Sequence, residues 1–164
     1  PYEVIRQRGL RSAEKRREIL TEHRRIAGGI GADGPFWDAL ERGDFVGPKC
    51  SSCNRWMWPA HYRCGTCGSW DIGWEAIEPS GSLYTWTRNH AVSDVIKERR
   101  EDTPYVTLLV ELPQAGSIRI PGVLEGSEEG LAIGAPLKGR HRPGDEKSKG
   151  YATMVWSLTA GDPA

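Results

Sequence analysis

The hydrophobic pattern divides the chain into a short helical part and a longer part made of strands. Between residues 12 and 27 the apolar residues recur at helical spacing, which predicts an amphipathic helix. Its apolar stripe is narrow, so it is either a solvated surface helix or one that docks on a partner. A second, shorter helix is expected to begin at Pro35, because proline fits the first helical position, with an apolar face of Phe36, Trp37 and Leu40.

Five segments between residues 81 and 158 have the alternating or β-branched pattern of strands. They are Leu83–Thr87, Val106–Leu112, Ile118–Leu124, a weaker segment Leu137–His141, and Tyr151–Leu158. The pair Pro121-Gly122 inside the third strand indicates an edge or a bulge, and a short helical turn is expected within 126–131. Five short strands in one compact segment fit a small Greek-key barrel, with an OB-fold as the leading candidate, although strand count alone leaves other small barrels open.

The cysteines form two Cys-x-x-Cys pairs separated by ten residues. They are Cys50, Cys53, Cys64 and Cys67. Each pair forms a turn that directs two thiolates at one ion, so the two turns together complete a tetrahedral site. Zinc is favoured, and the spacing leaves rubredoxin-type iron open. Four thiolates leave no position for water, which predicts a structural ion. A redox dithiol would need one reactive pair and not two facing pairs. His61 lies between the pairs and is a possible replacement ligand, although the simpler interpretation is a loop histidine.

Composition and charge narrow the function classes. The chain of 164 residues has 22 Lys and Arg against 22 Asp and Glu, and this zero net charge argues against a dedicated nucleic-acid binder. No run of 18 apolar residues and no signal-peptide pattern occurs, so neither a membrane span nor secretion is expected. A cytoplasmic, reducing location then favours metal over two disulfides for the cysteines.

No catalytic machinery is apparent in the sequence. The histidines are scattered, and no nucleophile elbow, phosphate-binding loop or dinucleotide-binding glycine motif occurs. His90 follows an expected strand and precedes a long polar connection, a place where functional residues occur, but a lone histidine is more often structural. We therefore predict no catalytic residue.

A series of short motifs resembles one known family. In order along the chain they are Phe36–Leu40 followed by Gly43, the four cysteines with Pro59 between the pairs, Ser80–Thr87, Pro104–Val106, Val110–Leu112 and Leu131–Gly134. Together these look like the proteins grouped as domain of unknown function 35, and the resemblance spans residues 34–157. It implies a mainly β fold with N-terminal helices, a rubredoxin-like zinc ribbon and a five-stranded OB-fold barrel. The expected boundaries are 1–46 for a helical docking or linker segment, 47–75 for the ribbon, 76–158 for the barrel and 159–164 for a tail.

The resemblance also implies a function. Members of the family sit beside, or are fused to, thiolase-like enzymes of acyl-CoA chemistry, including thiolases and the aldolases of steroid side-chain breakdown. The implied role is a non-catalytic accessory subunit in a hetero-oligomer, with structural zinc and with a coenzyme A thioester as the shared ligand of the complex. Fusion to a hydratase-like domain is a further implication. One departure is Pro59-Ala60-His61, where the family often has Pro-Pro-Arg.

Coenzyme A carries phosphates, so basic residues on or beside the barrel strands are candidates to bind it. They are Arg88, Arg99, Arg100, Arg119, Lys138 and Arg140. Each of them alone is also compatible with solvated surface charge. Two other classes stay open: a nucleic-acid-binding module with Tyr84, Trp86 and Trp156 as stacking platforms, and an autonomous enzyme, which would need a catalytic set that the sequence does not show.

Overall fold

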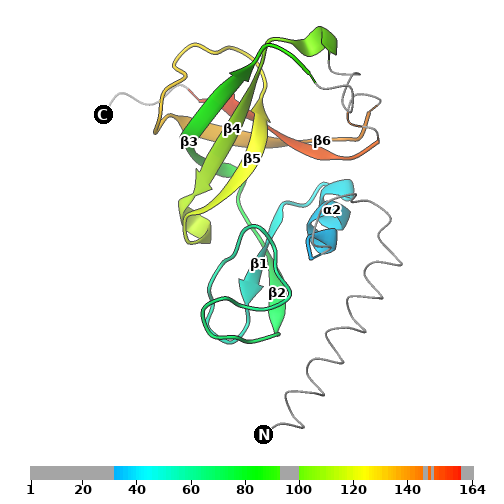
Figure 1. Ribbon diagram of the computed structural model, residues 1–164, viewed down its shortest axis with the longest axis vertical. Coiled ribbons are helices and arrows are strands. Elements are labelled where there is room, and N and C mark those ends of the chain that lie inside the picture. Colours follow the sequence, from blue (N-terminus) through cyan, green and yellow to red (C-terminus); the bar gives the residue numbers. More distant parts are fainter. Residues whose placement is uncertain (1–31, 93–99, 146–147, 149, 160–164) are drawn as a thin grey trace, which may run out of the picture.

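A computed structural model describes residues 32–92, 100–145, 148 and 150–159. The helix expected between residues 12 and 27 lies outside these residues. The order of elements is α2 (Gly34–Glu41), β1 (Val46–Cys50), β2 (Ile72–Ala76), β3 (Ser80–Asn89), β4 (Tyr105–Leu112), the 3-10 helix η2 (Pro113–Ala115), β5 (Ile118–Leu124), β6 (Pro136–Arg142) and β7 (Thr153–Leu158). Figure 1 shows the barrel strands above, the β1–β2 hairpin below and α2 beside the hairpin. No helix among the described residues is long and apolar enough to cross a lipid bilayer.

The five expected strands form a closed barrel with the order β3-β4-β5-β7-β6. All neighbours are antiparallel except β5 and β7, which pair in parallel through Val123 with Val155 and Leu124 with Trp156. This order is that of an OB-fold, so the predicted fold class is confirmed. Pro121 pairs with Leu109 of β4 but lies before the β7 pairing begins. Its missing N–H is therefore tolerated, because that side of β5 is an edge.

The barrel core follows from the alternation of β4. Every second residue of β4 is buried, so the buried residues all lie on the face of the strand that points into the barrel. They are Val106, Leu108, Val110 and Leu112, which pack with Leu83, Ile120, Leu137 and Trp156. Trp156 has 0% of its surface exposed. A Cβ at Gly122 would lie 2.4 Å from the Trp156 indole and one at Gly139 would lie 3.0 Å from it, so the two glycines let this ring lie directly against the backbones of β5 and β6.

The helical segment and the ribbon share this core with the barrel. Phe36, Leu40 and Phe45 belong to the same buried cluster as the barrel residues. The Phe45 ring lies 6.0 Å from the Trp156 ring, and the Phe36 ring lies 4.8 Å from that of Trp58, between ring centres. These edge-on aromatic contacts fix the hairpin against one end of the barrel.

Two local features differ from the expectations. The segment 126–131 contains a turn, in which the Leu131 N–H donates to the Glu128 carbonyl at 3.0 Å, and no helical segment. Gly126 and Gly130 have positive φ angles of 94° and 82°, which a right-handed helix does not accept. The strand β2 and the helix η2 were not expected from the sequence.

Candidate metal centre

The two cysteine pairs lie in the β1–β2 hairpin, from the last residue of β1 into the segment that connects the two strands. Cys50 is the last residue of β1 and pairs with Ile72 of β2. Each pair is followed by the same turn. The Asn54 N–H donates to the Cys50 carbonyl at 2.8 Å, and the Gly68 N–H donates to the Cys64 carbonyl at 3.0 Å. Asn54 and Gly68 both have left-handed backbones, with φ angles of 59° and 74°. Asparagine and glycine adopt this conformation most easily, so the sequence provides two equivalent turns.

The four sulfur atoms converge on one point. All four Sγ atoms lie within 4.8 Å of one another. The Sγ atoms of Cys50 and Cys67 are 3.5 Å apart, and those of Cys53 and Cys64 are 3.7 Å apart. A tetrahedral zinc ion with bonds of about 2.3 Å separates its sulfur ligands by roughly 3.8 Å, so the donor set fits this ion. Among the described residues no other set of His, Cys, Asp and Glu is grouped in this way, and His61 is not part of the group.

The thiols differ in their environment. Cys50 and Cys64 are buried, whereas Cys53 and Cys67 are exposed. The backbone amides of Cys67 and Thr66 donate toward the Cys64 sulfur and lower the pKa of this thiol to about 6. The backbone amide of Arg55 lowers the pKa of Cys53, but partial loss of solvent around the sulfur and the three neighbouring sulfurs outweigh it and raise this pKa to about 12. Four thiolates cannot coexist here unless a cation offsets their repulsion, as a bound metal ion does.

Acidification is expected to release the metal ion. Only the deprotonated sulfur binds zinc, so metal affinity falls as the pH falls. The ion should be retained near pH 8 and lost in acid, at a pH below the value of about 6 for the pKa of metal-free Cys64, because the bound cation itself favours the thiolate. Zinc that remains with the protein after desalting at each pH, measured with a chelating dye, checks this. Equal zinc content at about pH 8 and about pH 4 would contradict a thiolate site.

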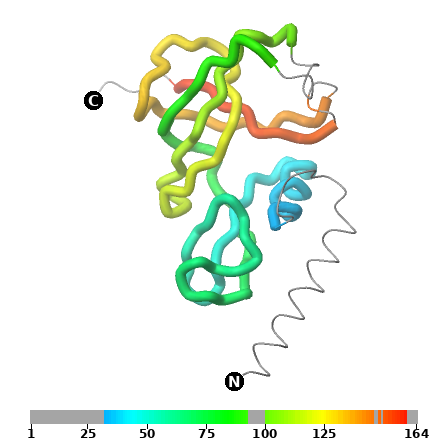
Figure 2. Tube along the Cα trace, in the orientation of Figure 1, coloured from blue at the N-terminus to red at the C-terminus, as the bar shows by residue number. Residues whose placement is uncertain are grey.

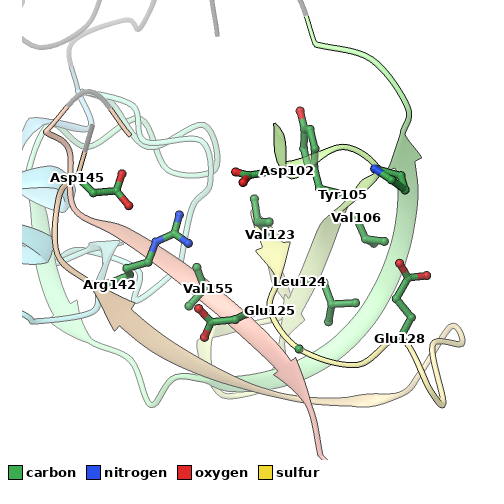
Figure 3. A pocket seen from close by; sticks show the side chains of 12 residues that line it. Asp102, Tyr105, Val106, Val123, Leu124, Glu125, Glu128, Arg142, Asp145 and Val155 are labelled. Carbon is green, nitrogen blue, oxygen red and sulfur yellow. The ribbon is translucent and has the colours of Figure 1, made fainter. Parts of the chain in front are cut away.

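A second concave region lies at the open end of the barrel. This pocket of about 540 Å³ lies where the β3–β4 and β6–β7 connections approach strands β4 and β5. OB-folds commonly bind oligonucleotides at this position. Figure 3 shows the Arg142 side chain reaching into the pocket, with carboxylates around it. Among the described residues, its lining has the acidic side chains Asp102, Glu125, Glu128 and Asp145 and one cation, Arg142. Such a lining opposes the binding of phosphate groups.

The structure does not gather the basic residues that were candidates for coenzyme A. Arg88 lies on β3, Arg119 on β5 and both Lys138 and Arg140 on β6, whereas Arg100 lies between β3 and β4. None of these five lines either barrel pocket, and Arg99 lies outside the described residues. Four of them form ion pairs: Arg88 with Glu128, Arg119 with Glu111 at 3.0 Å, Lys138 with Glu78 at 3.1 Å, and Arg140 with Glu125 at 2.6 Å. Sequence reasoning did not find these acidic partners or Arg142, because no local motif links them.

Comparisons with known proteins agree with this architecture. Residues 37–71 match the family model of the ChsH2 rubredoxin-like zinc ribbon domain, and residues 74–142 match that of the ChsH2 C-terminal OB-fold domain. None of the curated proteins matches the sequence.

Two solved structures are similar in fold. One is described as the Ltp2-ChsH2(DUF35) aldolase. It has a TM-score of 0.68 and 23% identity, and the match covers 83% of this chain and 100% of that one. The other is a DUF35 protein of unknown function from Sulfolobus solfataricus, with a TM-score of 0.55 and 19% identity over 85% of this chain and 94% of that one. Because the ribbon and barrel models follow each other along the sequence in the observed order of domains, this chain belongs to the ChsH2-type family of zinc-ribbon and OB-fold proteins.

Proposed function

We propose that the protein is a non-catalytic accessory subunit or domain that binds a thiolase-like enzyme and supports its acyl-CoA chemistry. The enzyme would be of the thiolase or steroid side-chain aldolase type. The observation that carries this proposal is the match over 100% of the ChsH2(DUF35) chain, which was solved as part of an aldolase together with Ltp2. At 23% identity the match establishes the fold, and the role in a complex is our extension of it.

The chemistry of the cysteine site supports a non-catalytic role. In our proposal Cys50, Cys53, Cys64 and Cys67 hold one structural zinc ion. A four-thiolate site has no open position at which water or substrate could reach the ion. The ion would instead hold the segment between β1 and β2 in place, and that segment packs beside the barrel through Trp56 and Trp58.

The ion pairs on the barrel limit what this chain could do with coenzyme A. A phosphate that approached Arg119, Lys138 or Arg140 would compete with the carboxylate already bound there. We therefore propose the coenzyme A thioester as a ligand of the whole complex, with its phosphates held mainly by the enzyme partner.

Nucleic-acid binding is the alternative function, and the charges oppose it. Phosphate contacts supply most of the affinity for a nucleic acid. The chain has no net positive charge, and the pocket at the usual OB-fold binding position is lined by four carboxylates. A gel shift with a short single-stranded oligonucleotide at low salt should be negative, and a clear shift would favour this alternative.

Co-expression with a thiolase-like protein from the same organism tests the proposal. We expect one complex in size-exclusion chromatography with light scattering, and acyl-CoA turnover that is higher with both chains than with the enzyme alone. The isolated chain should turn over no acyl-CoA. A thiolase from an unrelated source serves as the control for non-specific binding. Absence of a complex, together with unchanged enzyme activity, would refute the accessory role.

A further inference from the structure

Exposed apolar side chains gather at one place on the barrel. Among the described residues the exposed large apolar side chains are Trp70, Tyr84, Trp86 and Ile133. Trp70 lies in the ribbon, and the other three lie at β3 and the segment next to it. Ile133 is 77% exposed. The Gly134 N–H donates to the Leu83 carbonyl at 2.7 Å, which places Ile133 beside the middle of β3. Figure 2 shows this part of the chain passing next to β3.

The same part of β3 has an open edge. On one side β3 pairs with β4 as far as Asn89. On the other side it pairs with β6 only from Ser80 to Ser82, followed by the contact of Leu83 with residues 134 and 135. Within the part of the chain that the structure describes, the stretch 84–89 therefore has a neighbouring strand on one side only. Backbone N–H and C=O groups along such an edge are complementary to another extended segment.

Aromatic side chains flank this edge on both faces of the strand. Trp86 pairs with the buried residue Leu108, so it lies on the inner face of the barrel sheet. Tyr84 packs against the guanidinium of Arg119, which lies 3.5 Å from the centre of the Tyr84 ring on the outer face. Side chains of an added strand alternate between the two faces. An added strand would thus contact Trp86 with one set of side chains and Tyr84 with the other.

The charges beside the edge favour a protein as its occupant. Arg88 lies over the Trp86 ring and pairs with Glu128, and Arg119 pairs with Glu111. Because both cations are neutralised, the surface does not attract phosphates, whereas aromatic and arginine side chains are enriched in protein interfaces. Next to Ile133 lies a hollow of about 740 Å³, whose apolar lining includes Ala132, Ala135, Pro136 and Leu158. It has room for an apolar side chain of the partner.

We propose that residues 84–89 and Ile133, here called the β3 edge, bind an extended and mainly uncharged segment of the enzyme partner as an additional strand. The identity of that partner rests on the proposed function. The ribbon, with its own exposed tryptophan, lies outside this contact.

Two substitutions at the β3 edge and one matched control test the assignment. Trp86→Ala removes an aromatic anchor, and Ile133→Asp places a charge in the contact. Trp70→Ala is the control, because Trp70 and Trp86 are 38% and 37% exposed and each has an arginine 5.5 Å from its ring centre. We expect each edge variant to weaken binding to the thiolase-like enzyme by at least about 10-fold, as for a central interface residue, and Trp70→Ala to change it by less than about twofold.

Hydrogen exchange supplies a readout that loss of a side-chain contact alone would not move. Amide exchange in residues 84–89 should slow in the wild-type complex, because added-strand hydrogen bonds protect these N–H groups. Circular dichroism of each variant confirms that it is folded.

The outcomes separate the edge from the proposed function. If the wild-type chain binds the enzyme but both edge variants bind equally well and residues 84–89 gain no protection, the edge assignment is overturned and the accessory role stands. If the wild-type chain binds no such enzyme, the proposed function fails, and the edge assignment fails with it. Concentration-dependent dimerisation that the edge variants abolish would instead identify a second copy of this chain as the occupant and overturn the proposal.

Discussion

Replacement of Trp156 by alanine is expected to destabilise the protein by about 3–5 kcal/mol, the usual cost of truncating a buried tryptophan. The Trp156 side chain is fully buried and contacts Phe45, the residue before β1. Its indole lies against the backbones at Gly122 and Gly139. Those contacts come from three different parts of the chain, so the space left behind cannot be filled by one local shift. Domains of this size are commonly stable by only about 5–15 kcal/mol, so the variant should be marginal.

The indole N–H gives this prediction a matched comparison. The Nε1 atom of Trp156 is buried without a hydrogen-bond partner. Trp156→Phe removes this unsatisfied donor while it keeps an aromatic ring, so its cost should be well below that of alanine. Trp70→Ala, at a 38% exposed site, should cost less than about 1 kcal/mol. Urea unfolding followed by far-UV circular dichroism measures all three. Equal losses for Trp156→Ala and Trp70→Ala would contradict the assignment of Trp156 to the centre of the core.

The barrel could be predicted from the sequence because apolar and less apolar residues alternate along its strands, and this alternation indicates which residues are buried. Val106, Leu108 and Val110 face the core while the residues between them are only half-buried, and this period of two survives in the sequence without any alignment. The strand β2 has no such signal. None of its residues is fully buried, and its position depends on pairing with β1 and on the half-buried Trp74, which packs against the core. A strand held by its partner strand leaves little trace in its own residues.

The cysteine site and the basic residues proposed for coenzyme A also differ in how far local sequence predicts them. The grouping of the four cysteines could be predicted because each pair places its cysteines three residues apart, and a tetrahedral metal site depends on that local spacing. The ion pairs of the barrel connect distant parts of the chain: Arg88 and Glu128 are 40 residues apart, and Lys138 and Glu78 are 60 apart. Only the closed barrel brings them together. The basic residues therefore looked like phosphate ligands in the sequence, although the fold pairs four of them with carboxylates.

The β3 edge could not be predicted from the sequence, because it depends on which strands pair in the barrel. In the nucleic-acid alternative that the sequence leaves open, the aromatic residues of β3 are stacking platforms for bases. The pairing of β6 with β3 ends after Ser82 because of the way the barrel closes. This leaves Tyr84 and Trp86 beside an unpaired strand edge, which the sequence alone does not show. Beside an open strand edge, Tyr84 and Trp86 are better suited to hold a peptide segment than a nucleic acid.

Replacement of Cys64 by serine is expected to abolish metal binding and to unfold the segment between β1 and β2. Apart from a single bridge between Lys49 and Trp56, the described residues 51–71 contain only turns and irregular structure, so few backbone contacts would hold this segment without the ion. Structural zinc contributes about 10–16 kcal/mol of apparent binding free energy in zinc-finger peptides, and binding in such sites is coupled to folding. Cys64 is 2% exposed, and a serine hydroxyl there would be a neutral and much weaker ligand.

The metal content and the local protection of the chain check this prediction. The wild type should carry one zinc ion per chain by elemental analysis, whereas Cys64→Ser should carry close to none, and its residues 51–71 should exchange amide hydrogens and be cleaved by proteases much faster. Ser52→Ala is the control in the same segment, since it removes only the exposed hydrogen bond to Ser69. If elemental analysis finds iron and the protein absorbs visible light, the bound ion is iron and not zinc, and the four-cysteine site stands. A Cys64→Ser variant that binds one ion per chain as tightly as the wild type would show that Cys64 is not a ligand and would refute the four-cysteine site.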